Sequence, residues 1–180
     1  LLSLRMVFAL PVFLWVGFRA SYSAPPLTRR DWLMLAALGL LGYYGASILD
    51  FIGLRYITAG LERLILFTYP TLTVLIGVLF MGKALERREI ASLALSYVGI
   101  GLAFAHDLQV AGDTAAVMVG AAFVFASSLS YAFYLAGSAP MIQRLGSARF
   151  TALALLVSTA ATLLHFFAVQ PLSALRQPLP

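Results

Sequence analysis

The chain has 180 residues, of which 62% are hydrophobic and only 11% are charged, and its mean hydropathy is +0.94. Soluble domains carry about a quarter of their residues as charged side chains, so this composition excludes an ordinary soluble fold and favours a membrane protein. Cysteine is absent, which excludes disulfides and thiol chemistry. The net charge is +5, but the basic residues fall mainly in short loops, and no basic stripe indicates a nucleic-acid interface.

Six apolar segments follow one another along the chain. A helix needs about 20 mostly apolar residues to cross a bilayer, and strict polar–apolar alternation, the mark of a membrane strand, is absent from these segments. We therefore predict an all-α membrane protein, a polytopic bundle of transmembrane helices. The expected spans are residues 1–18, 32–56, 61–81, 90–105, 115–141 and 150–168.

The distribution of Lys and Arg predicts the orientation of these spans. Loops 19–31, 82–89 and 142–149 hold 8 of the 12 basic residues, so we expect them on the cytoplasmic side of the cell membrane. The loop at 106–114 has two Asp and no Lys or Arg, and it falls on the opposite side. The chain is thus expected to be a multi-pass protein of the inner membrane.

The second span carries three polar residues on one helix face: Tyr43, Ser47 and Asp50, at positions i, i+4 and i+7. Asp50 lies six residues from the outer end, on the order of 9 Å deep. A carboxylate within the membrane costs roughly 2.5–3.5 kcal/mol, so Asp50 should face a cavity or a partner. Two interpretations remain open: a site for a proton or a cationic substrate, or a structural pair with Arg55 or Arg63.

The third span has a stripe at i, i+4, i+7 and i+11, formed by Glu62, Leu66, Tyr69 and Thr73. Pro70 removes one helical hydrogen bond and predicts a kink near Leu66, which would serve as a hinge or expose a carbonyl to substrate. Glu62 and Arg63 either belong to the site or lie at the outer interface, where long side chains reach water.

The fifth span carries hydroxyl groups on one face, at Ser127, Ser130, Tyr131, Tyr134 and Ser138. These groups would line a pore or bond to a neighbouring helix for about 1 kcal/mol each. The sixth span has a similar stripe at Thr151, Ser158, Thr162 and His165. In the fourth span, Ser92, Ser96, Gly99 and Ala103 predict a seam of close helix packing, as do the glycines at 39, 42 and 45.

An internal repeat is faintly visible. Ser3-Leu4-Arg5 opens the first span, and Ser147-Ala148-Arg149 opens the sixth, 144 residues later. Five spans separate the two openings, and an odd number of crossings makes the second copy upside down. Inverted repeats of this kind are typical of secondary transporters, and this offset predicts a protein of ten spans.

Three motifs carry a family resemblance: YITAGLERLILFTYPTLTVL, the loop GKALERRE, and YLAGSAPMIQRLGSARFTALALL. With them, the chain resembles the EamA-type family of drug/metabolite transporters over nearly its whole length. The resemblance implies ten helices in two inverted halves around a central cavity, and the export or exchange of small metabolites. Residues 1–106 would be helices two to five of the first half, and residues 115–180 the first two helices of the second. Helix one and helices eight to ten would lie outside this chain, so we expect the chain alone not to transport.

The sequence and the resemblance together predict a secondary transporter for a small metabolite or drug-like solute, working by alternating access, with proton or ion coupling as an option. The second, third, fifth and sixth spans would face one cavity, and the fourth would pack outside. The residues expected at this cavity are Tyr43, Ser47, Asp50, Glu62, Arg63, Tyr69, Thr73, Ser127, Tyr131 and Tyr134, with Pro70 as a hinge.

Two other classes of protein stay open. One is a structural or sensor membrane domain without transport. The other is an intramembrane enzyme that modifies lipids, which would need an acid–base pair or a His-Asp set at membrane depth. We find no catalytic motif, no cofactor motif and no metal-ligand spacing, since His106 and His165 are the two histidines. The expected partners are a small solute, the lipid bilayer and the missing helices of the same protein.

Overall fold

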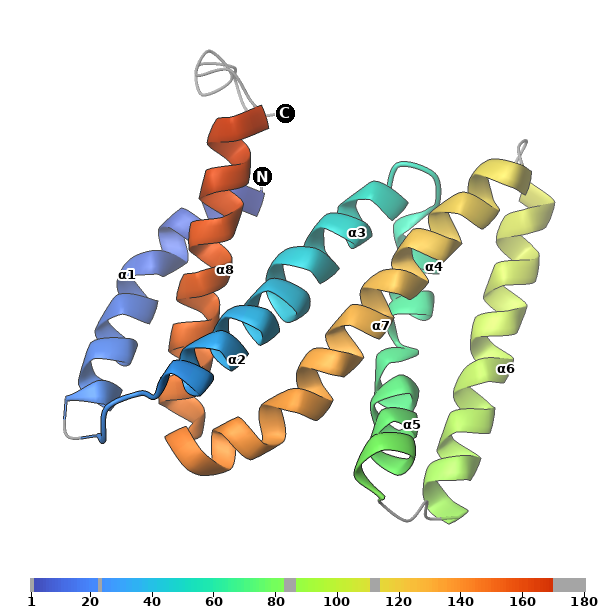
Figure 1. The fold of residues 1–180 in the computed structure, drawn as a ribbon. Coiled ribbons are helices and arrows are strands. Elements are labelled where there is room, and N and C mark those ends of the chain that lie inside the picture. The colour runs from blue at the N-terminus through green and yellow to red at the C-terminus, as the bar shows by residue number, and fades with distance from the viewer. Residues whose placement is uncertain (1, 23, 83–86, 111–113, 170–180) are drawn as a thin grey trace. The chain divides into compact units, whose positions relative to one another are not determined.

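The computed structural model describes residues 2–22, 24–82, 87–110 and 114–169, and these ranges contain helices and no strands. The helices are α1 (Leu2–Ser21), α2 (Arg29–Gly39), η1 (Leu40–Gly45), α3 (Ala46–Gly53), α4 (Ala59–Leu66), α5 (Tyr69–Met81), α6 (Arg87–Val110), α7 (Thr114–Leu145) and α8 (Ser147–Val169). Figure 1 shows them in chain order. The predicted all-α polytopic fold is confirmed.

Helix boundaries follow from local capping chemistry. Thr28 begins α2 with a reciprocal capping box: Asp31 N–H donates to Thr28 Oγ1 at 3.3 Å, and Thr28 N–H donates to Asp31 Oδ2 at 2.8 Å. Thr58 begins α4 by accepting from Leu61 N–H at 3.2 Å. Gly82 ends α5 in the left-handed conformation, which glycine adopts without steric cost.

Four stretches among the described residues are long and apolar enough to cross a membrane: Arg29–Gly53, Ala59–Phe80, Thr114–Leu145 and Ser147–Ala168. They match the predicted second, third, fifth and sixth spans. The first and fourth predicted spans correspond to shorter apolar helices, Met6–Ser21 and Ile90–Leu102. Many large apolar side chains on these helices are exposed, as expected for surfaces that face lipid.

Three predicted loop or helix ends were wrong. The second span ends at Gly53 instead of residue 56, because Tyr56 and Ile57 N–H both bond back to Gly53 O as the chain turns. The fourth span continues as α6 to Val110, through much of the loop expected at 106–114. The loop expected at 142–149 is helical apart from a sharp turn at Gly146, where φ is +82°.

The chain forms two compact units. The first contains residues 1–40 and 140–180, in which α8 packs against both α1 and α2. Gly39 makes the second of these contacts possible, since a Cβ there would lie 2.7 Å from Ala154 O. Two buried charged side chains link the ends of helices in this unit. Asp31 forms a 2.9 Å ion pair with Arg144, and Arg149 donates to Ser21 Oγ and Pro25 O.

The second unit contains residues 41–139, and α7 is its central helix. Leu61 and Ile65 of α4 pack against Val117 and Val124 of α7 in a buried apolar core. Beside it, the backbones of α3 and α7 approach closely, since a Cβ on Gly120 would lie 3.1 Å from Gly53 O. The close packing places the polar faces of α3, α4 and α7 around a common space, described next.

The predicted seam of the fourth span meets no neighbour within the described part of the chain. Ser92, Ser96 and Gly99 are exposed on α6, and a Cβ on Gly99 would find no atom within 4 Å. The two serine hydroxyls bond instead to carbonyls of their own helix, Ser92 to Arg88 O and Ser96 to Ser92 O. No helix among the described residues packs on this stripe, so its role as a packing seam stays a prediction.

Candidate functional site

A cavity of about 180 Å³ lies within the second unit, among η1, α3, α4, α5 and α7. The residues that line it are Gly42, Tyr43, Ala46, Ser47, Asp50, Leu66, Tyr69, Ser127, Ser128 and Tyr131. The walls are thus aromatic and aliphatic, with one carboxyl group and a few hydroxyl groups. This combination is typical of small-molecule sites, in which a few polar groups orient a mostly apolar ligand.

The polar face of the second span reaches this cavity. Tyr43, Ser47 and Asp50 all line it, as their spacing predicts. Asp50 lies only three residues before the end of α3, so it is shallower than predicted, roughly one turn or 4.5 Å from the helix end. The preceding turn, Leu40–Gly45, is a π-helix, a form that is rare and often found at functional sites.

Four tyrosine rings form a continuous cluster along one side of the cavity. Tyr69 meets Tyr131 edge to face at 5.1 Å, and Tyr131 stacks on Tyr134 at 5.6 Å. Tyr134 meets Tyr43 at 5.0 Å and donates a hydrogen bond to its hydroxyl at 3.1 Å. Each such pair contributes roughly 0.5–1.5 kcal/mol beyond its buried area, so the cluster fixes the rings in place.

Pro70 breaks the third span where the sequence predicts a kink. Helix α4 ends at Leu66, and α5 begins at Tyr69 with the proline in its first turn. Pro70 has no N–H to donate to Leu66 O, four residues earlier. Ser128 Oγ donates to this carbonyl instead, at 3.2 Å, and lies at the same distance from Ile65 O. The freed carbonyl is therefore satisfied by α7, and a hinge at Pro70 stays a prediction.

The sequence left two roles open for the serines of α7: lining a pore or bonding to a neighbouring helix. Their hydrogen bonds show which role each serine has. Ser127 lines the cavity, and its hydroxyl donates across to Ala46 O at 2.7 Å. Ser130 donates to Leu41 O at 2.7 Å, at the start of the π-helix. Ser138 donates to Leu135 O in its own helix. These hydroxyl groups mainly hold backbone carbonyls, and those of Ser127 and Ser130 attach η1 and α3 to α7.

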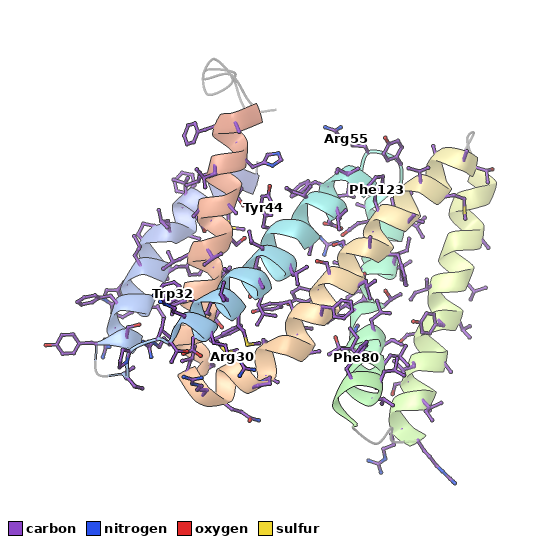
Figure 2. All side chains as sticks on the ribbon, in the orientation of Figure 1. Arg30, Trp32, Tyr44, Arg55, Phe80 and Phe123 are labelled. Carbon is purple, nitrogen blue, oxygen red and sulfur yellow. The ribbon has the colours of Figure 1, made fainter. Side chains whose placement is uncertain are left out.

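Two acidic side chains lie close together beside the cavity. The carboxyl groups of Asp50 and Glu62 act electrostatically on each other, and the Arg63 guanidinium acts on both. The sequence did not decide whether Glu62 belongs to the site or lies at the outer interface. In the structure its side chain is buried. Arg55, the other partner considered for Asp50, is exposed, and Figure 2 shows its side chain directed away from the helices at the turn after α3.

Some predicted site residues do not line the cavity. Tyr134 stacks on Tyr131, which does line it, and Glu62 and Arg63 act electrostatically on Asp50. Thr73 donates to Tyr69 O one turn earlier in its own helix, at 2.7 Å. The sixth span was expected to face this cavity, and this stays a prediction. Within the first unit, Thr162 donates to Ser158 O and Thr159 donates to Leu155 O, so these buried hydroxyls bond to carbonyls of their own helix.

Among the polar residues that line the cavity, sequence reasoning missed Ser128. It is fully buried and lies next to Ser127, so it falls off the face that the hydroxyl spacing defines. The available signal was Pro70, whose missing N–H requires a donor from another helix. Within the described residues, no group of three His, Asp or Glu side chains is arranged to hold a metal ion.

These helices, with their lipid-facing apolar side chains and an internal polar cavity, define an all-α multi-pass membrane protein. The sequence profile of the EamA-like transporter family matches residues 1–105. The chain belongs to this family. It is also similar to the "Uncharacterized transporter YcbK" of Bacillus subtilis (strain 168), with 28% identity over 167 residues, which cover 89% of the chain and 51% of that protein. The chain thus spans about half the length of this curated relative. No solved structure gives a significant match.

Proposed function

We propose that the tyrosine-lined cavity is the solute-binding site of a secondary transporter that exports or exchanges a small metabolite or drug-like molecule. The observation that carries this proposal is the cavity itself. A carboxyl group, three serines and three tyrosines line a cavity among helices that are otherwise largely apolar. Polar groups at membrane depth are costly, and they concentrate where proteins handle polar solutes.

Membership of a transporter family and the name of the relative support the same function. Because the chain spans about half of that relative, we propose that the intact protein has ten helices in two inverted halves. In this arrangement residues 1–106 belong to the first half and residues 115–180 to the second. Transport would then proceed by alternating access, with Pro70 as a hinge in one of the moving helices.

The basic loops give the proposed location and orientation. Loops 19–31 and 142–149 contain Arg side chains that the positive-inside rule assigns to the cytoplasm. Loop 82–89 is basic as well, and its residues 83–86 lie outside the described residues. We accordingly place the protein in the inner membrane. A structural or sensor domain, or a lipid-modifying enzyme, would lack solute flux, so one assay separates these classes.

The test uses the full-length protein in proteoliposomes, loaded with mixtures of labelled small metabolites and screened for protein-dependent flux. Glu62→Gln and Tyr131→Ala should each lower the flux of a transported solute at least tenfold without lowering the amount of inserted protein. Tyr22→Phe, at an exposed position in the first unit, is the matched control and should leave flux unchanged. Lipid turnover, or no flux for any solute, would reject the transport proposal.

A further inference from the structure

Resting on the solute site proposed above, we infer that Ser127 and Ser130 are positioning residues, which hold the π turn of the second span in place and so decide which side chains face the cavity. Ser130 is not among the residues that line the cavity, so a hydroxyl group outside the cavity wall gains a role in the site. Three features of the second unit carry the inference: the two serine hydrogen bonds, the surplus residue of the π turn, and the spacing of the polar side chains after it.

Helix α7 holds the π turn from outside at both of its ends. Ser130 Oγ donates to Leu41 O at 2.7 Å, near the start of the turn, and Ser127 Oγ donates to Ala46 O at 2.7 Å, just after its last residue. The two serines are three positions apart, so one face of α7 supplies both donors. Between the two acceptors, Gly42 leaves no room for a Cβ against a tyrosine ring of the same helix. The turn is therefore held by two hydrogen bonds and a close ring contact.

Outside donors are needed because a π turn does not satisfy all of its own backbone groups. Its hydrogen bonds join residues i and i+5, and the change from the α-helical pattern of i and i+4 leaves one carbonyl without an N–H partner in the helix. In the hydrocarbon part of a membrane, no water replaces that partner. The α form is common and the π form is rare, so a π turn that loses its outside donors should revert to an α-helix. The serine hydroxyls are the groups that oppose this change.

The position of the π turn sets which residues face the cavity. An α-helix advances about 100° per residue, and the surplus residue of the π turn sets every later residue back by one position. Ser47 and Asp50 line the cavity in this register, and Leu49 does not. In a span that is α-helical throughout, each of these residues would stand where its successor stands now. Leu49 would then replace Asp50 at the cavity, so the loss of the two hydrogen bonds would exchange a carboxyl group for an apolar side chain.

The span can release its surplus residue at the end that follows Asp50. The start of α2 is fixed by the reciprocal capping box of Thr28 and Asp31. Helix α3 ends at Gly53, three residues after Asp50, and the chain then turns over residues 54–57. The surplus residue can pass into this turn without disturbing the cap at the other end. The part of the span that carries Asp50 is therefore the part whose register depends on the serines.

The test measures which residues of α3 face water in the full-length protein, purified in detergent. This chain has no cysteine, and any cysteine elsewhere in the protein is first replaced by serine, so that single cysteines report on chosen positions. A thiol reacts as its thiolate, which forms in a wet cavity and not in apolar surroundings. With a small polar methanethiosulfonate reagent, Ser47→Cys should therefore react about tenfold faster than Leu49→Cys. Adding Ser127→Ala and Ser130→Ala should reverse this order, with a slower reaction at position 47 and a faster one at position 49.

Two further variants separate this role from a general loss of structure. Ser138→Ala removes a hydroxyl group that donates to Leu135 O in its own helix, so it should leave both reaction rates unchanged. Ser130→Thr keeps a hydroxyl donor at the same position. Combined with Ser127→Ala, it should therefore restore the original order of the two rates, which Ser130→Ala does not.

The order of the two rates decides the outcome. An unchanged order in the double alanine variant, or rates at positions 47 and 49 that rise or fall together, would overturn the inference, since only a slip of the helix moves them in opposite directions. The labelling needs no transport. A reversed order in a protein without solute flux would uphold the role of the serines and count only against the transport proposal. Full solute flux in the double alanine variant would overturn the inference and leave the transport proposal intact.

Discussion

The Ser128 hydroxyl lies 3.2 Å from the carbonyl oxygen of Leu66, the acceptor that Pro70 leaves without its helical donor. The two residues belong to different helices, α7 and α4. Ser128 is fully buried, so water does not replace its hydrogen bond. The break in the third span is thus stabilised by the neighbouring helix, and the two positions should be energetically coupled.

Replacing Ser128 by Ala should destabilise the protein by about 1–3 kcal/mol, because a buried carbonyl loses its donor. The measurement is unfolding of the full-length protein in increasing SDS, followed by circular dichroism. In a Pro70→Ala background, residue 70 supplies its own N–H to Leu66 O, and the same serine substitution should cost less than half as much. Equal costs in the two backgrounds would contradict this coupling.

A methyl group on Gly42 should displace the Tyr134 ring. A Cβ at this position would overlap the tyrosine side chain, which also donates to the Tyr43 hydroxyl. We expect Gly42→Ala to cost about 1–3 kcal/mol by overpacking, measured as above, and to weaken solute binding through the shifted cluster. Gly99→Ala is the control: nothing lies within 4 Å of its Cβ, so the substitution should be neutral or stabilising by up to about 1 kcal/mol. Equal effects at both glycines would contradict the packing argument.

The ion pair between Asp31 and Arg144 should be asymmetric in its response to substitution. Asp31 is almost fully buried, and its other oxygen accepts from Thr28 N–H and Thr28 Oγ1. Asp31→Asn therefore weakens both the cap of α2 and the pair, and we expect a loss of about 1–3 kcal/mol. Arg144 is half exposed, so Arg144→Gln should cost less than about 1 kcal/mol. The same SDS titration compares the two variants, and an Arg144 effect as large as that of Asp31 would disprove the cap's contribution.

Hydropathy and spacing predicted much of this fold because each depends on residues close together in the sequence. The helices fall within a few residues of the expected spans, and Tyr43, Ser47 and Asp50 share a face because their spacing alone requires it. Pro70 marks the break in its own helix for the same reason. These features need no knowledge of how the helices cross.

The remaining features depend on contacts between distant segments. Ser128 meets Leu66 across 62 positions of sequence, and Asp50 and Glu62 act electrostatically on each other because the chain turns sharply after Gly53. Hydroxyl periodicity could not tell a cavity wall from a helix contact, and Ser130 proves to be the second. The polar stripe of the sixth span likewise could not tell a cavity wall from packing within the first unit, where α8 contacts α1 and α2.

The π turn at Leu40–Gly45 has a consequence for where Asp50 points. An α-helix rotates by about 100° per residue, and a π turn accommodates one surplus residue without breaking the helix. Losing the surplus residue of this turn would therefore leave a regular α-helix and keep the Asp50 carboxyl group on the same side of the span. The same loss inside α3, between Ala46 and Asp50, would rotate the carboxyl group about 100° around the helix axis. Two one-residue deletions a few positions apart should thus have opposite effects on the site.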